Sequence, residues 1–114
     1  MDKILITGGA GYIGSHTVKE LLKLGYSTLV LDNLINGHRE LVCGGELIEG
    51  DLQDGALLQN IFSGHSIEAV MHFAAYAYVG ESVTDPGKYY RNNVCGTLNL
   101  VEAMLKARVK KIIF

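Results

Sequence analysis

Tryptophan is absent from this chain of 114 residues, proline occurs once and cysteine only twice. The two cysteines, Cys43 and Cys95, are too few for a disulfide framework, which favours a reducing, cytoplasmic compartment. The four histidines show no paired spacing, so we expect no metal site. No apolar run is longer than a strand, and the start at Met1 lacks the pattern of a signal peptide. We therefore expect no membrane segment.

Charge is also sparse. The formal net charge is −2, and Lys110-Lys111 is only a pair rather than part of a basic cluster. Neither feature gives a reason to expect nucleic acid or an anionic membrane as a partner.

Glycine, by contrast, is abundant, with 14 residues. Its most informative run is Thr7-Gly8-Gly9-Ala10-Gly11-Tyr12-Ile13-Gly14. The run directly follows an apolar strand candidate at 3–6, so it predicts a strand, a tight turn and a helix whose N-terminus receives a diphosphate. Gly8 and Gly9 would allow the turn. Gly11 would leave no side chain between backbone and phosphate, and Gly14 would let the helix lie close to the strand.

An acidic residue at the right distance strengthens this interpretation. Asp32 closes the next apolar run, 27–31, and lies 18 residues beyond Gly14. A carboxylate that accepts hydrogen bonds from the adenosine ribose is expected roughly 20 residues after the glycines. Arg39 is a rival signal, because a cation near the ribose would favour the 2′-phosphate of NADP. Asp32 is better placed, so the sequence predicts a dinucleotide site that prefers NAD.

Apolar runs of strand length alternate with amphipathic segments of helix length, which predicts βαβ units. The expected strands are 4–7, 28–32, 46–49, 69–73 and 111–114. The expected helices are 12–24 (stopped by Gly25), a short stretch up to Val42, 53–62 and a long helix opened by Asp85-Pro86. Successive right-handed crossovers predict an α/β fold, a Rossmann-like doubly wound parallel sheet with strand order 3-2-1-4-5.

The long helix and the end of the chain carry two further expectations. Apolar residues recur at helical spacing and are predicted to face the sheet: Val94, Leu98, Val101 and Leu105. The last expected strand, 111–114, ends without a turn or a polar tail, so we expect residues 1–114 to be the N-terminal portion of a domain truncated after its fifth strand.

Six motifs, spread over essentially all 114 residues, identify a family. They are the run 7–17, Leu31-Asp32-Asn33-Leu34, Glu49-Gly50-Asp51-Leu52, His72-Phe73-Ala74-Ala75, Val79-Gly80-Glu81-Ser82-Val83 and the segment 89–97. On these motifs the chain resembles the N-terminal part of an extended short-chain dehydrogenase/reductase. The first motif is shared by many relatives, whereas 79–83 and 89–97 narrow the resemblance to the epimerases.

The resemblance implies an NAD site along the chain. Beside the diphosphate would lie Gly8, Gly11, Tyr12, Ile13 and Gly14. Around the adenosine ribose would lie Asp32, Asn33, Leu34, Asn36 and Gly37. Next to the adenine would lie Asp51 and Leu52, and along the nicotinamide half Phe73, Ala74, Ala75, Ala77 and Asn92. Ala77 departs from the family, which often has lysine there. From the residues alone Asp51 could equally be a turn residue, and His72 is interpreted as a core histidine rather than a ligand.

The resemblance further implies NAD-dependent epimerisation of a UDP-hexose at C4, with a catalytic Ser/Thr and a Tyr-x-x-x-Lys pair beyond the fifth strand. No such pair lies in residues 1–114, since Tyr89 is followed four residues later by Asn93 and Tyr12 by His16. We therefore predict no catalytic residue here, no activity of the chain alone, and UDP-sugar binding only with the missing C-terminal part.

Two alternatives remain open. The chain could be a non-catalytic nucleotide-binding or interaction module that pairs with a second copy or another chain through its exposed sheet. It could also be the NAD-binding part of a related sugar-nucleotide dehydratase. The resemblance also implies homo-oligomers, because relatives commonly dimerise through two helices per subunit, of which the long helix would be one.

Overall fold

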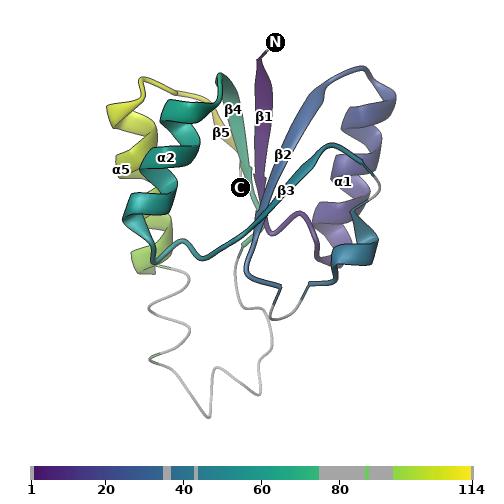
Figure 1. The fold of residues 1–114 in the computed structure, drawn as a ribbon, viewed down its shortest axis with the longest axis horizontal. Helices are drawn as coiled ribbons and strands as arrows, with labels where there is room; N and C mark the ends of the chain where they lie inside the picture. The colour runs from purple at the N-terminus through teal and green to yellow at the C-terminus, as the bar shows by residue number, and fades with distance from the viewer. Residues whose placement is uncertain (1, 35–36, 43, 75–86, 88–93, 114) are drawn as a thin grey trace.

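The computed structural model describes residues 2–34, 37–42, 44–74, 87 and 94–113. In chain order its elements are β1 (Lys3–Thr7), α1 (Tyr12–Lys23), β2 (Ser27–Asp32), the 3-10 turn η1 (Arg39–Leu41), β3 (Glu46–Glu49), α2 (Gly55–Gly64), β4 (Ile67–His72), α5 (Gly96–Lys106) and β5 (Ile112–Ile113). Figure 1 shows the strands standing between two layers of helix. None of the described helices is long and apolar enough to cross a bilayer.

The five strands form one parallel sheet in the order β3-β2-β1-β4-β5, which confirms the predicted topology. β1 and β2 lie in its interior and are buried along nearly their whole length. Their continuous apolar runs fit this position, because a strand covered on both faces needs apolar side chains on both.

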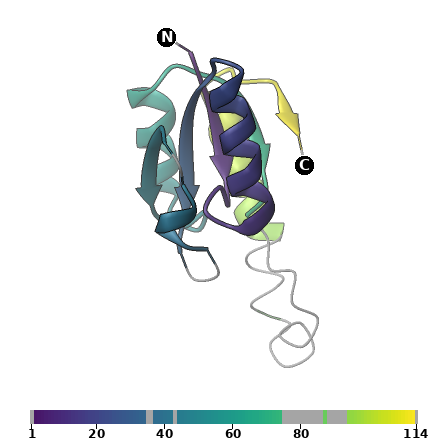
Figure 2. The ribbon, with the colours of Figure 1, turned by 90° about the vertical axis from the view of Figure 1, so that its right-hand side faces the viewer.

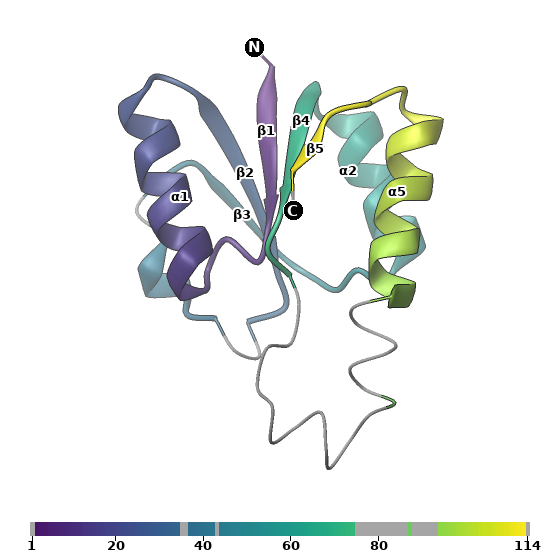
Figure 3. The same cartoon turned by 180° about the vertical axis from the view of Figure 1, so that it is seen from behind.

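Helices cover the two faces of the sheet unequally. α1 packs on one face, where Val18 joins Ile4, Ile6 and Val30 in a small core cluster. α2 and α5 pack on the other face over a larger cluster that includes Leu58 (Figures 1 and 3). In Figure 2, α1 lies in front of the sheet, and β5, the edge strand beside β4, is seen at one side.

The helix ends follow local signals in the sequence. Gly25 follows α1 with a φ of 89°, a left-handed conformation that suits a glycine just past a helix end. The Asp54 carboxylate accepts a hydrogen bond from the Leu57 amide at 3.0 Å and caps α2. Because this cap fixes the first turn, α2 begins at Gly55, two residues after the predicted start. The expected start of the long helix at Asp85-Pro86 lies outside the described residues.

The prediction of which side of α5 faces the sheet was wrong. Leu98 and Leu105 are 56% and 68% exposed, and Val94 is also exposed. The buried residues of α5 are Gly96, Leu100, Ala103 and Met104. The apolar residues of α5 lie on two nearly opposite sides of the helix, since positions two apart are separated by about 200° around its axis. The side that packs inward includes Gly96 and Ala103, whose small size permits a close approach. A Cβ on Gly96 would already lie 3.1 Å from the Leu52 Cβ.

Candidate functional site

The predicted site residues gather where the parallel strands end. The glycine turn follows β1, Asp32 ends β2, Asp51 follows β3 and Phe73 follows β4. All four lie at the carboxyl edge of the sheet, toward the bottom of Figure 1. The chain reverses its direction across the sheet between β1 and β4, and the crevice at such a switch point is where open α/β sheets bind ligands.

The turn after β1 is packed against two neighbouring segments. Gly8 has a φ of 73°, and a Cβ there would lie 2.7 Å from the Phe73 carbonyl carbon. Gly14 lies against the same turn, because a Cβ on it would be 2.2 Å from the Gly8 carbonyl oxygen. Both positions therefore require glycine, one for its backbone angle and one for the close approach of α1. This agrees with the roles predicted from the sequence.

The N-terminus of α1 faces outward from this turn. No described side chain caps it, and its first turn holds no acidic residue. Tyr12 and Ile13 in that turn are 77% and 66% exposed. Among the described residues, a Cβ on Gly11 would meet only the Gly8 oxygen, at 3.4 Å. An uncapped helix start is suited to bind an anion, because its first amides have no partner within the helix.

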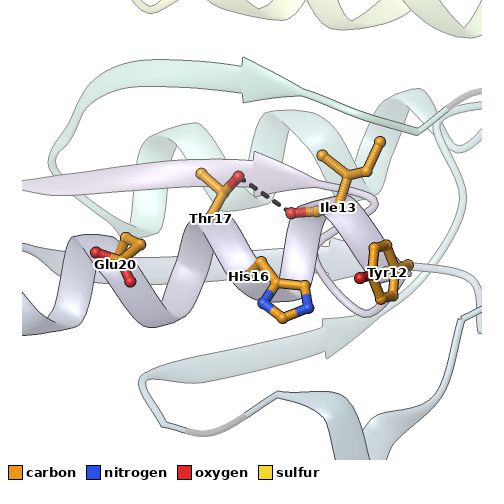
Figure 4. A pocket seen from close by; sticks show the side chains of 5 residues that line it. All are labelled: Tyr12, Ile13, His16, Thr17 and Glu20. Atoms are coloured by element: carbon orange, nitrogen blue, oxygen red, sulfur yellow. Dashed lines mark hydrogen bonds between the residues drawn. The ribbon is translucent and has the colours of Figure 1, made fainter.

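The outer side of the same helix forms an open pocket next to the turn. Figure 4 shows the side chains that line it: Tyr12, Ile13, His16, Thr17 and Glu20. The rings of Tyr12 and His16 meet edge to face with centroids 4.8 Å apart. The pocket shares only its first two residues with the predicted site, so it borders the site rather than forming it.

Both carboxylate oxygens of Asp32 accept hydrogen bonds from backbone amides. Its Oδ2 accepts a hydrogen bond from the Ala10 amide at 3.0 Å, and its Oδ1 accepts one from the Leu34 amide at 2.8 Å. Only 8% of the residue is exposed. Among the described residues each oxygen has one such amide as its partner, which leaves it a further lone pair for a ligand. A Cβ on Gly37 would lie 2.9 Å from Oδ2, so this glycine lets the chain pass close over the carboxylate.

The acid after β3 is oriented by its neighbours. Asp51 Oδ1 accepts from the Gln53 amide at 2.9 Å, and Oδ2 accepts from the Asn33 side-chain amide at 3.3 Å. The first bond is that of a turn residue, the bland alternative considered for Asp51. The second joins Asp51 to the end of β2, so two predicted site residues do meet. The Leu52 side chain is buried in the core, and its carbonyl accepts from Asn99 Nδ2 at 2.8 Å.

A buried histidine holds the segment after β4. His72 Nδ1 lies 2.5 Å from Thr7 Oγ1, and its Nε2 lies 2.9 Å from Thr97 Oγ1 on α5. Thr7 Oγ1 also accepts from the Ala74 amide at 3.3 Å, and the Thr7 carbonyl accepts from the Phe73 amide at 2.8 Å. Burial lowers the pKa of His72. The interpretation of His72 as a core histidine fits this arrangement.

Some predicted positions are not placed. Asn36, Ala75, Ala77 and Asn92 lie outside the described residues. Three polar contributors were missed from the sequence: the Ala10 amide and the hydroxyls of Thr7 and Thr97. The only available signal was the position of Thr7 at the head of the glycine run. Among the residues that the structure places, no group of three or more histidine, cysteine or acidic side chains could hold a metal ion.

Comparison with known proteins gives a family and close relatives. Residues 4–114 match the NAD dependent epimerase/dehydratase family. A UDP-glucose 4-epimerase of Halalkalibacterium halodurans is 54% identical over 111 residues, which cover 97% of this chain and 33% of that protein. A UDP-glucose 4-epimerase of Klebsiella pneumoniae is 50% identical over an alignment of 120 positions, which covers 98% of this chain and 86% of that sequence. The chain thus spans about a third of the length of the first relative.

The fold has close counterparts among solved structures. The UDP-glucose 4-epimerase from Brucella ovis in complex with NAD matches with a TM-score of 0.96 and 50% identity. The match covers 100% of this chain and 35% of that one.

Proposed function

This chain belongs to the NAD dependent epimerase/dehydratase family, and we propose that it is the NAD-binding portion of an enzyme that epimerises a UDP-hexose at C4, interconverting UDP-glucose and UDP-galactose. The observation that carries the proposal is the contact between the glycine turn and Asp32, in which the Ala10 amide donates a hydrogen bond to the Asp32 carboxylate. The similarity to UDP-glucose 4-epimerases at about half identity supports the choice of reaction.

The described residues would contact four parts of NAD. The uncapped start of α1, with the open approach at Gly11, would receive the diphosphate. Asp32 has lone pairs left for ribose hydroxyls, and Asp51 would meet the adenine edge. Phe73 and Ala74 would border the nicotinamide half, together with the predicted residues that the structure does not describe. When bound, NAD supplies a reversible hydride acceptor.

The reaction needs more than these 114 residues. They contain no Tyr-x-x-x-Lys pair to act as the general base. The chain's own residues bind and orient the cofactor, so we expect the chain alone to be inactive. UDP-sugar binding would likewise require residues that this sequence does not contain. The proposal assigns the parent enzyme to galactose metabolism. The low cysteine content of this chain supports a cytoplasmic location.

We also propose that the protein forms oligomers through α5. The outward side of this helix carries the exposed apolar side chains of Leu98 and Leu105, and Val94 just before the helix is also exposed. An apolar stripe of this kind supports pairing with a helix of another chain.

The proposed function can be tested with a chimera. This chain would replace the corresponding N-terminal third of the H. halodurans enzyme, and conversion of UDP-galactose to UDP-glucose would be measured. We expect an active chimera, loss of most activity and bound NAD in its Asp32→Ala form, and no activity of the 114-residue chain alone. A chimera that retains NAD but converts no UDP-galactose, or activity indifferent to Asp32→Ala, would contradict the proposal.

A further inference from the structure

We propose that His72 is a positioning residue, the centre of a hydrogen-bond relay that joins the end of β1, the segment after β4 and the first turn of α5. The relay consists of the Ala74 amide, the Thr7 hydroxyl, the His72 ring and the Thr97 hydroxyl. Its consequence for cofactor binding rests on the proposed function, because the relay fixes two backbone segments that NAD would contact: the glycine turn and residues 73–74.

The four groups form a continuous chain of contacts. The Ala74 amide lies 3.3 Å from Thr7 Oγ1, which lies 2.5 Å from His72 Nδ1. His72 Nε2 then lies 2.9 Å from Thr97 Oγ1. Thr7 is fully buried and His72 is only 8% exposed. Polar groups so deep in a sheet edge are tolerated because each has a partner.

The proposal includes an arrangement of the protons. Thr7 Oγ1 accepts from the Ala74 amide, and in the proposed relay its single hydrogen is donated to His72 Nδ1. A neutral ring with an acceptor at Nδ1 carries its proton on Nε2 and donates it to Thr97 Oγ1. The lowered pKa of the buried ring fits a neutral imidazole.

The relay lies where these two backbone segments are in contact. A Cβ on Gly8 would lie 2.8 Å from the Ala74 nitrogen and 2.7 Å from the Phe73 carbonyl carbon, so the glycine turn rests directly on this peptide. Thr7 accepts from two consecutive amides of this segment, from Phe73 through its carbonyl and from Ala74 through its hydroxyl oxygen. A shift of residues 73–74 would therefore displace the turn that receives the diphosphate. Preorganisation of this contact would favour binding, since less order is lost when the ligand enters.

Matched substitutions at the two ends of the relay provide the test. Thr7→Val and Thr97→Val keep the side-chain shape and remove a hydroxyl, whereas Thr7→Ser and Thr97→Ser keep the hydroxyl. In the wild-type chain we expect the ¹⁵N shifts of His72 to show the neutral form protonated on Nε2. Thr7→Val should change that signature and speed hydrogen exchange of the Ala74 amide, and Thr7→Ser should restore both. If Thr7→Val does not fold, Thr97→Val tests the other end of the relay, because it removes the Thr97 hydroxyl that lies against His72 Nε2.

The effect on NAD is measured by calorimetric titration of the same variants. Loss of one buried hydrogen bond of the relay should weaken NAD binding roughly tenfold in the valine variants, with little change in the serine variants. An Nδ1-protonated ring, or Thr7→Val with unchanged Ala74 exchange and unchanged NAD affinity, would overturn the relay. A wild-type chain that shows the expected tautomer and exchange but does not bind NAD would support the relay and contradict NAD binding by this chain.

Discussion

The carboxylate of Asp32, at the end of β2, accepts a hydrogen bond from the backbone amide of Ala10, in the turn after β1, at 3.0 Å. The residue that would contact the ribose is thus also a clamp on the loop that would contact the diphosphate. Its second oxygen holds the Leu34 amide, so one buried side chain orders the backbone on both sides. The proposed ribose and diphosphate parts of the site are therefore coupled through Asp32 in the ligand-free fold.

This double role predicts that Asp32 contributes to stability as well as to binding. Asp32→Ala would leave two backbone amides without acceptors, and we expect a loss of about 2–4 kcal/mol in the free energy of unfolding. Asp32→Asn keeps one acceptor oxygen and should lose roughly half as much. Urea unfolding followed by circular dichroism measures both. Equal stability of wild type and Asp32→Ala would show that the clamp is energetically silent.

Two glycine-to-alanine substitutions should have opposite effects. The Cβ of Gly14→Ala would lie 2.2 Å from the Gly8 carbonyl oxygen, so α1 must move away from the turn. We expect a loss of about 2–3 kcal/mol and of any NAD affinity. Gly55→Ala is the matched control, because no atom of the described residues lies within 4 Å of that Cβ and the residue begins α2. It should stabilise the chain by about 0.4–1 kcal/mol. Thermal unfolding of the two variants side by side tests the pair, which fails if Gly14→Ala is tolerated as well as Gly55→Ala.

A buried hydroxyl marks a site where the chain can be stabilised. Thr28 is 2% exposed, and its Oγ1 has no hydrogen-bond partner among the described residues. Thr28→Val replaces this hydroxyl by a methyl group of similar shape and should raise the free energy of unfolding by about 1 kcal/mol. Thr17→Val is the control on the surface of α1, where a change within about 0.5 kcal/mol is expected. A destabilised Thr28→Val would mean that the hydroxyl has a role the structure does not show.

The lowered pKa of His72 predicts a loss of stability in mild acid. Burial holds this pKa below its ordinary value of 6.5, so between the two values the unfolded chain binds a proton that the folded chain does not. The stability contributed by the neutral ring is complete above about pH 6.5 and falls as the pH drops toward the folded-state pKa. His72→Gln keeps a donor and an acceptor but cannot titrate. Urea unfolding from pH 8 to 5 should show a shallower decline for His72→Gln than for wild type, and parallel declines would refute the assignment.

The fold was readable from the sequence because its signals are local and agree with one another. The apolar runs marked all five strands, and the right-handed crossover rule ordered them. The glycine run located the turn because Gly8 needs a left-handed backbone and Gly14 a close contact, both properties of single residues. The inward face of α5 was not readable, since Leu98 and Leu100 belong to two apolar sides of the helix and spacing alone does not rank the two sides.

The site was readable only in part. The position of Asp32 could be predicted from its distance to Gly14, but its bond to Ala10 depends on how two loops meet after the sheet has formed. The same holds for His72, whose partners Thr7 and Thr97 lie 65 and 25 residues away along the chain. The local pattern located Asp32 and His72 at the ends of strands, whereas long-range packing decides what their side chains bind.

The most direct test of this account is a calorimetric titration of the 114-residue chain with NAD, beside Asp32→Ala and Asp32→Asn, with circular dichroism to establish that each chain is folded. The account predicts saturable binding by the wild-type chain, reduced in Asp32→Asn and abolished or weakened at least tenfold in Asp32→Ala. A folded wild-type chain that gives no binding heat, or binding that Asp32→Ala leaves unchanged, would contradict the claim that the glycine turn and Asp32 form a working NAD site.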